Sequence, residues 1–323
     1  MHISSKSYLM NSLKRLFQSI SSPTLALALV ASAPLALRAA ELGQAFATPE
    51  AAVSALAAAA STQDTNALRV IFGPAAADLE NADRVQATND LNEFASAFNQ
   101  TNRIVHESDS KCVLEIGNSF WPFPVPLVKQ DGRWFFDAEA GKDELLTRRI
   151  GRNERLTLQS VRAYVEAQRE YAMKDRDGDE VLAYAQKILS TPGKKDGLYW
   201  PSDLDGEVSP LGPLVAEAQA QGYRRNLGGG DAPQPFHGYF FKILTRQGKS
   251  APLGKYNYLI NGKMIAGFAL VAWPAEYGDT GIMTFIVNQQ GRVYQKDFGP
   301  KTDKIAAAMK EYNPDKTWTI SPD

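Results

Sequence analysis

The stretch TFIVNQQGRVYQKDFG, residues 284–299, indicates how the second half of this chain folds. Apolar or aromatic side chains recur at Phe285, Val287, Val293 and Phe298, and a Gln-Gln-Gly segment between the two groups supplies a bend. This pattern predicts two short antiparallel strands joined by a tight turn. Nothing in the hairpin is arranged for a reaction, so it indicates assembly or binding rather than chemistry.

Further strands and helices are expected around this hairpin. The strand patterns are GYFFKIL (238–244), YNYLI (256–260), KMIAGFALVAWP (263–274) and GIMTFIVN (281–288), with Asn-Gly at 261–262 as a hairpin turn. Helices are expected over about 140–174, in EVLAYAQKIL (180–189), near 212–222 and over KIAAAMKEY (304–312). In the first of these helices one face is traced by Leu158, Val161, Val165, Gln168 and Tyr171.

The first half reads as helices followed by an antiparallel sheet. Helices are expected in 47–61, 64–73 and 89–100, the first with Thr48 as N-cap and Pro49 at its first position. Strands are expected in 102–108, 111–117, 123–130 and 133–139, the last two joined by an Asp-Gly turn at 131–132. The fold class is therefore α+β, with one domain over 40–145 and a second over 146–323.

Residues 1–39 have the composition of a secretory signal peptide. Lys6, Lys14 and Arg15 form a basic segment, the apolar run 24–37 follows, and small residues favour cleavage after Ala39. The alternative is an uncleaved anchor. Cleavage would remove four basic residues and no acidic one, which changes the net charge from −1 to −5. We expect a periplasmic or secreted protein without a later membrane span, with no electrostatic basis for binding nucleic acid.

Few residues suggest catalysis. Cys112 is the only cysteine, so no disulfide within the chain is possible, and its strand context indicates a small buried hydrophobe. The alternative is a nucleophile paired with His106, six residues earlier. His237 lies in the other predicted domain and is expected to be structural. The glycine-rich segment 226–233 does not fit a phosphate-binding loop, and the basic run TRRIGRNER (147–155) is expected to be solvated helix surface.

Two acidic turns are candidates for calcium binding. DRDGDE supplies Asp175, Asp177 and Asp179, and DLDGE supplies Asp203 and Asp205. Alternate carboxylates on a glycine turn can converge on a hard cation. The first turn fails the spacing of an EF-hand loop, however, and Asp and Gly are also common where a helix ends. Calcium is the only cofactor that the sequence gives grounds to consider, and bound calcium predicts a melting temperature that falls when a chelator is added.

Aromatic side chains beside prolines form the candidate binding residues. SFWPFP (119–124) contains Trp121, GLYWP (197–201) contains Tyr199 and Trp200, and Trp134 lies in the last strand of the first sheet. Such rings line ligand clefts or protein-binding patches. The alternative is that they close the edge of a core or cover a seam between domains.

The whole chain after the signal resembles a bacterial envelope family known as domain of unknown function 2950. The resemblance rests on DGRWFFDAEAGK (131–142), STPGKKDGLYWP (190–201), SPLGPL (209–214), PFHGYFFKILTRQG (235–248) and GFALVAWPAEYG with GIMTFIVNQQGRVYQKDFG (267–299). Membership implies export and two modules, and it implies no known activity.

More distant resemblances concern each half separately. Helices followed by a curved sheet that closes on KQDGRWFFDAE resemble the cone-shaped nuclear-transport-factor-2-like fold. The second half is similar to the soluble part of type IV pilins and pseudopilins, on the helix around 167–171 and the strands GFALVAWP and FIVNQQGRVY. In a prepilin a processing site and an apolar helix directly precede that region, whereas here a whole domain does. A fold by itself does not give a function.

These observations favour an exported envelope module for binding or assembly, without catalysis of its own, whose partner is an envelope protein or a small ligand. The alternative is a hydrolase or a small-ligand-binding protein that uses the cavity of the first domain. A pocket with two convergent polar groups, including a carboxylate of raised pKa, would favour the enzyme. A cone filled by Trp134, Phe136 and Phe94 would favour the binding module.

Overall fold

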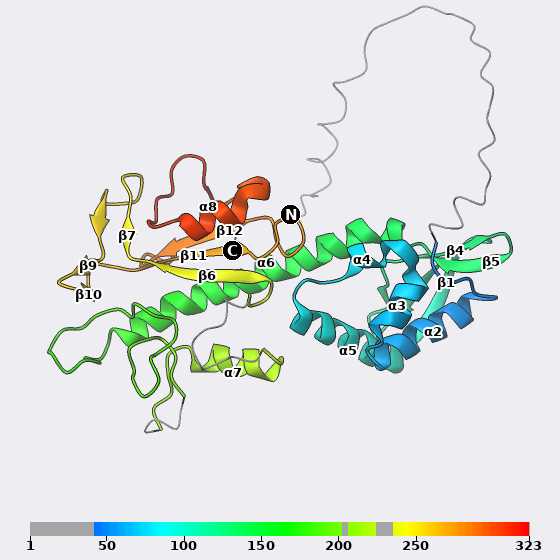
Figure 1. Ribbon diagram of the computed structural model, residues 1–323, viewed down its shortest axis with the longest axis horizontal. Coiled ribbons are helices and arrows are strands. Elements are labelled where there is room, and N and C mark those ends of the chain that lie inside the picture. Colours follow the sequence, from blue (N-terminus) through cyan, green and yellow to red (C-terminus); the bar gives the residue numbers. More distant parts are fainter. Residues whose placement is uncertain (1–41, 202–205, 224–234, 323) are drawn as a thin grey trace, which may run out of the picture. The chain divides into compact units, whose positions relative to one another are not determined.

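The computed structural model of the chain describes residues 42–201, 206–223 and 235–322 (Figure 1). The predicted signal peptide, the glycine-rich segment 226–233 and the candidate ligands Asp203 and Asp205 lie outside the described residues. Helices and antiparallel sheets occur in both halves, which confirms the α+β class.

The first half contains helices that pack on one antiparallel sheet. Its helices are α2 (Pro49–Ser61), α3 (Thr65–Phe72), the 3₁₀ turn η1 (Gly73–Ala75), α4 (Ala76–Leu79) and α5 (Arg84–Gln100). Its strands are β1 (Asn102–Ser108), β2 (Lys111–Ile116), β3 (Trp121–Pro122), β4 (Leu127–Gln130) and β5 (Arg133–Phe136). Thr48 caps α2 as predicted, because its Oγ1 accepts a 3.2 Å bond from the Ala51 amide.

The strands of this first sheet run in the order β1-β2-β4-β5, and β3 pairs with β2. The predicted turn between β4 and β5 is confirmed, with Asp131 and Gly132 at φ values of 50° and 77°. Phe46 extends the sheet edge through two backbone bonds with Trp134, of 2.8 and 2.9 Å. Helices α2 and α3 pack against β5, whereas α5 packs against β1 and β2.

Helix α6 (Ala138–Tyr171) is continuous for 34 residues and contributes to both halves. Asp137 caps it by accepting a 3.1 Å bond from the Ala140 amide. The apolar face predicted for this helix is confirmed. Val161, Val165 and Tyr171 are buried in the hydrophobic core of the second half, here called the second core. The predicted boundary between residues 145 and 146 falls inside this helix and stays a prediction.

The second half is built around a five-stranded antiparallel sheet in the order β14-β13-β12-β11-β6. Its helical elements are α7 (Gly212–Ala220), η2 (Gly299–Lys301) and α8 (Thr302–Ala308). Its longer strands are β6 (Tyr239–Leu244), β11 (Ala269–Pro274), β12 (Thr284–Asn288) and β13 (Tyr294–Lys296). The two-residue strands are β7 (Arg246–Gln247), β8 (Tyr256–Asn257), β9 (Leu259–Ile260), β10 (Lys263–Met264) and β14 (Thr319–Ile320).

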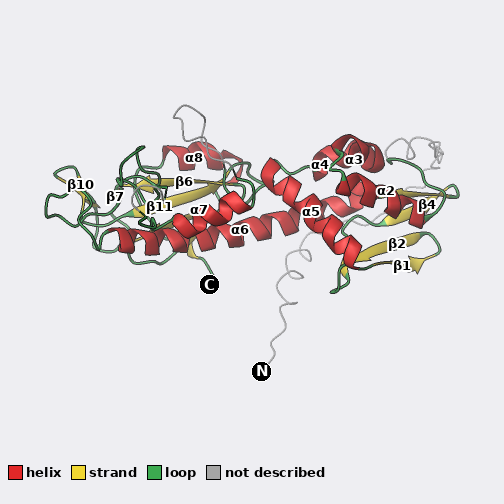
Figure 2. Cartoon of the chain, turned by 90° about the horizontal axis from the view of Figure 1, so that it is seen from below, coloured by secondary structure: helices red, strands yellow, loops and turns green. Residues whose placement is uncertain are grey.

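The hairpin of residues 284–299 lies at the centre of this sheet. β12 pairs with β13 in the register Phe285↔Gln295, and Gly291 takes a positive φ of 78° in the turn. Every residue of β11 and β12 is buried. Helices α6 and α8 explain this, since they lie on opposite faces of the sheet (Figures 1 and 2). A sheet covered on both sides needs apolar residues on both faces.

One expected helix is wrong. Residues 180–189 form no helix, because partners elsewhere in the chain take their backbone groups. The Tyr184 amide donates a 2.8 Å bond to the carbonyl of Met264, and the carbonyls of Lys187 and Ile188 accept from the amides of 198 and 199 at 3.1 and 2.9 Å. These bonds replace the i→i−4 pattern that a helix requires.

The end of the chain also differs from expectation. Helix α8 stops at Ala308 rather than near 312, and the short strand β14 follows it. The ammonium group of Lys242 donates to the carbonyls of Ala306 and Ala307 at 3.3 and 2.5 Å. A cation there stabilises a helix C-terminus, and Met309 directly after the helix is already extended. Among the described residues no helix has both the length and the hydropathy to cross a bilayer.

The buried amide of Gln168 generates a stability prediction. Its Nε2 donates to the Tyr164 hydroxyl at 3.0 Å and to the carbonyl of Ala185 at 2.8 Å, and its Oε1 accepts from the Ala185 amide at 2.9 Å. Gln168→Leu leaves the peptide groups of Ala185 without partners, so we expect a loss of about 1–3 kcal/mol in the free energy of unfolding. Urea denaturation measures it. Gln159→Leu, on the exposed face of α6, is the control and should change stability by less than about 0.5 kcal/mol.

Candidate functional site

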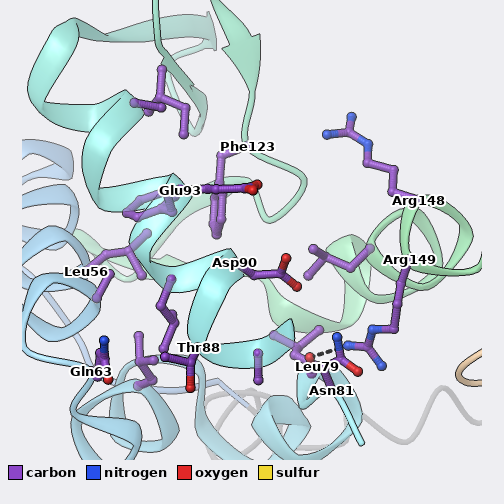
Figure 3. Close-up of a pocket in the computed structure, with 18 of the residues that line it drawn as sticks. Leu56, Gln63, Leu79, Asn81, Thr88, Asp90, Glu93, Phe123, Arg148 and Arg149 are labelled. Atoms are coloured by element: carbon purple, nitrogen blue, oxygen red, sulfur yellow. Dashed lines mark hydrogen bonds between the residues drawn. The ribbon is translucent and has the colours of Figure 1, made fainter. Parts of the chain in front are cut away.

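A cavity of about 1170 Å³ lies beneath helix α5. Its walls come from α2, α3, α4, α5, the segment around β3 and the first half of α6. Figure 3 shows Leu56 of α2 on one side and Arg148 and Arg149 of α6 on the other. The apolar part of the lining includes Leu56, Leu68, Phe72, Leu91, Phe94 and Phe123.

Helix α5 packs on α2, β1 and β2, yet little of it is fully buried where it borders the cavity. All 17 of its residues are described, and Gln86 alone is buried. Leu91, Phe94 and Ala97 line the cavity and are only half-buried. An amphipathic helix normally gains its stability by burying its apolar stripe. The apolar stripe of α5 therefore faces a space that described side chains leave open.

Helix α6 supplies a basic wall. Leu145, Arg148, Arg149 and Arg152 line the cavity at spacings of three, four and seven residues, which place them on one helix stripe. The expectation that residues 147–155 are solvated surface is wrong for Arg149, whose side chain is only 7% exposed. The helical spacing was a signal that could have identified this wall, once a cavity beside it was known.

Protein partners hold each of these arginines. Arg148 donates to Glu144 at 2.6 Å and to the carbonyl of Pro122 at 3.2 Å, and its guanidinium lies 4.5 Å from the ring centroid of Trp121. A cation over an indole ring is attracted to its electron-rich face. These contacts fix the Arg148 side chain and hold it at the edge of the cavity.

The other two arginines are held more deeply. Arg149 donates to Asp279 and, at 2.6 Å, to the carbonyl of Leu79. Arg152 forms a two-pronged ion pair with Asp90, at 2.7 and 2.9 Å. Burial lowers the pKa of Arg152, but the bonds to Asp90 outweigh it and leave this pKa above its ordinary value.

Asn81 lies at the same end of the cavity, near Arg149 (Figure 3). Its Oδ1 accepts a 3.0 Å bond from the Asp83 amide. Its Nδ2 is inaccessible to solvent, and among the described residues no acceptor lies within hydrogen-bond distance of it. An unsatisfied buried donor costs about 1–3 kcal/mol. Since water does not reach Nδ2, this donor does not open onto the solvent-filled cavity.

Asp83 joins the cavity helix to the second half of the chain. Its carboxylate accepts from the Val85 and Gln86 amides, both at 3.1 Å, and so caps α5. The same carboxylate accepts from the Tyr223 hydroxyl at 2.7 Å and from the Gly238 amide at 3.2 Å. Four donors satisfy this buried anion, so the start of α5 is fixed to residues far away in the sequence.

The sequence-predicted aromatic residues do not gather in one site. Trp121 lines the cavity and is 40% exposed at its edge. Trp134 is buried in the first core, so there the alternative interpretation holds. Trp200 is buried in the second core beside the half-buried Tyr199, and its indole donates a 3.1 Å bond to the carbonyl of Glu207.

The three rings named above do not fill one space together. Trp134 and Phe136 belong to the buried core, whereas Phe94 lines the open cavity. An enzyme was expected to show a pocket carboxylate of raised pKa. Glu80, a carboxylate of the lining, does not have one. A bond from Arg69 at 2.6 Å lowers the pKa of Glu80, which is the opposite of what a general acid needs.

The first acidic turn is occupied by protein groups. Asp175 accepts from the backbone amides of Asp177, Gly178 and Glu180 at 3.1, 2.8 and 2.7 Å. The Lys263 ammonium binds both Asp177, at 3.0 Å, and Asp179. Among residues 42–201, 206–223 and 235–322, no three acidic, histidine or cysteine side chains are grouped to hold a metal ion.

The structure does bring Cys112 and His106 together, with 3.1 Å between Sγ and Nδ1. They face each other across the β1–β2 ladder. Cys112 is fully buried, and burial followed by the charges of Glu50 and Glu107 raises the pKa of its thiol. A nucleophilic cysteine needs a lowered pKa and access to substrate, so this pair lacks both requirements.

Residues 43–320 match the family described as protein of unknown function (DUF2950). The chain belongs to this family. No curated protein and no solved structure matches the chain significantly. The resemblances of its halves to nuclear-transport-factor-2-like domains and to pilins therefore stay predictions. The cavity beneath α5 and the arginines of α6 lie within the matched region of this DUF2950 protein.

The Asp83 junction predicts a large effect of a single substitution. Asp83→Ala removes the cap of α5 and leaves the buried Gly238 amide without its acceptor, so we expect a loss of about 2–4 kcal/mol in the free energy of unfolding. Asp64→Ala is the matched control, because exposed Asp64 caps α3 through a single bond. It should cost about 1 kcal/mol. If chemical denaturation shows equal losses for Asp83→Ala and Asp64→Ala, Asp83 does not join α5 to the second half of the chain.

Buried His237 predicts a dependence of stability on pH. Burial lowers its pKa to about 4, with Arg152 adding to the effect and Asp83 opposing it. The unfolded chain binds this proton near pH 6.5, so His237 contributes stability that is present above pH 6.5 and lost as the pH falls toward 4. The difference amounts to at most about 3 kcal/mol. His237→Asn tolerates the φ of 50° and should lose less stability over this range in pH-dependent denaturation. Equal slopes for both proteins would rule out this role.

Proposed function

We propose that this protein is an exported binding protein of the cell envelope that holds a small apolar or amphipathic molecule in the cavity beneath α5. The observation that carries the proposal is the open, apolar space between α5 and the first core. Export is proposed from the signal-like residues 1–39. This function is the binding alternative that the sequence already offered for the first domain.

The size and lining of the cavity support ligand binding. Small-molecule sites occupy about 300–1,000 Å³, are mostly apolar and carry a few placed polar groups. The cavity has about 1170 Å³, with apolar walls from α2, α3 and α5 and a polar wall from α6. A ligand there would cover the apolar stripe of α5, and each buried CH₂ group would contribute roughly 0.8 kcal/mol.

A binding role is favoured over hydrolysis by the chemistry of the groups around the cavity. Asp90 is held by Arg152, and Glu80 has a lowered pKa. The Cys112–His106 pair lies in the β1–β2 ladder, and neither residue lines the cavity. The described groups of the site therefore suit holding a molecule better than transferring a proton to it.

Filling the cavity is the test of this function. Ala97→Phe adds a ring on the lining side of α5, so we expect at least a tenfold weaker binding of an uncharged apolar dye such as N-phenyl-1-naphthylamine, together with equal or higher stability. Ser96→Phe adds the same ring at the neighbouring exposed position and should leave dye affinity unchanged. Fluorescence titration measures both. If the dye fails to bind the parent protein, or if Ala97→Phe binds it equally well, the proposed function is wrong.

A further inference from the structure

We propose that the ligand is an anionic amphiphile, in which a carboxylate or phosphate group binds at the arginine wall of α6 and an apolar body lies beneath α5. This inference rests on the proposed function, because it assigns the chemical class of ligand to the same cavity. It is carried by the polar groups of that wall, which nothing in the family assignment explains.

The guanidinium groups of Arg148 and Arg149 have more N–H donors than they have described partners. Each guanidinium has five N–H donors, and the bonds that Arg148 and Arg149 make to described residues use two apiece. A ligand group with several acceptor atoms and no donor of its own satisfies such a wall.

The donors are held in position before a ligand arrives. Glu144 and the carbonyl of Pro122 hold Arg148, whereas Asp279 and the carbonyl of Leu79 hold Arg149. Of these four partners, none lines the cavity except Leu79, so they position the arginines mainly from behind. Because these side chains are already ordered, binding costs less entropy than it would with mobile arginines.

The carboxylates of the lining are paired or exposed to solvent, so they repel an added negative charge only weakly. Asp90 is neutralised by its two bonds to Arg152, and Glu80 is paired with Arg69. Glu93 is exposed, so solvent and salt screen its charge. Planar guanidinium groups match the geometry of carboxylate and phosphate oxygens and bind them more strongly than they bind neutral acceptors.

The rest of the lining suits an apolar body. Phe72, Phe94 and Phe123 form an aromatic group, with ring centroids of Phe94 and Phe123 5.3 Å apart. Leucines from α2, α3 and α5 continue this surface. A free inorganic anion would leave all of this surface uncovered, and a purely apolar molecule would leave the arginine donors without an added acceptor. A molecule with both parts satisfies both walls.

The experiment compares matched C16 compounds as competitors of the uncharged dye N-phenyl-1-naphthylamine on the purified mature chain. Hexadecanoate and hexadecyl phosphate carry an anionic group, and 1-hexadecanol carries none. We expect the anions to displace the dye at concentrations at least tenfold lower than the alcohol does. The comparison between the two anions identifies which headgroup the wall prefers, and a preference for either one supports the inference.

Two substitutions test the wall itself. Arg148→Gln, at the cavity edge, should reduce the preference for the anions by about tenfold and leave the alcohol unaffected. Arg148→Lys keeps the positive charge without the planar donor fork, so it should restore only part of the preference that Arg148→Gln removes. Arg155→Gln, exposed on the same helix and outside the lining, is the control and should change neither affinity.

The outcomes separate this inference from the proposed function. If the alcohol and the anions displace the dye equally, or if Arg148→Gln does not change the preference, the anionic class is wrong and the apolar cavity remains a binding site. If the dye does not bind the parent protein at all, the proposed function fails and the inference fails with it.

Discussion

The arrangement of this protein depends on the incomplete burial of helix α5. Its sequence carries a regular apolar stripe, yet Gln86 is its one buried residue. The helix is held instead at its start, where Asp83 caps it, and through Asp90, which binds Arg152 of α6. Because these polar bonds add to its packing on α2, β1 and β2, the helix can border a cavity of about 1170 Å³ without losing its place. A bound apolar molecule would bury this stripe and so add to the stability of the folded protein.

Helix α6 places this cavity beside the second core. Its second half lies against the sheet of β11 and β12 (Figure 2). Its first half supplies arginines to the lining of the cavity. Arg149 bonds Asp279, and Asn153 donates a 2.9 Å bond to the carbonyl of Thr280, so the segment after β11 lies against the same helix. The second sheet, covered on both faces, thereby acts as a rigid support for the wall that we propose binds an anion.

Much of the fold follows from local patterns in the sequence. The Thr48 cap, the Asp-Gly turn at 131–132 and the hairpin of β12 and β13 depend on neighbouring residues, so the sequence predicted them correctly. The helix predicted for residues 180–189 was wrong because the backbone groups of these residues bond to distant segments. The cavity could not be predicted from the sequence. The apolar stripe of α5 by itself indicates a helix that faces a core. The space beside this stripe depends on where α2 and α6 lie, and in the described chain no side chain fills it.

Native mass spectrometry of the protein purified without detergent from its own cell envelope would show whether the cavity holds a ligand. We expect a complex heavier than the mature chain by the mass of one small amphiphile, released on unfolding and absent from Ala97→Phe. A ligand-free mass for the parent protein, unchanged after incubation with an excess of hexadecanoate or 1-hexadecanol, would contradict it.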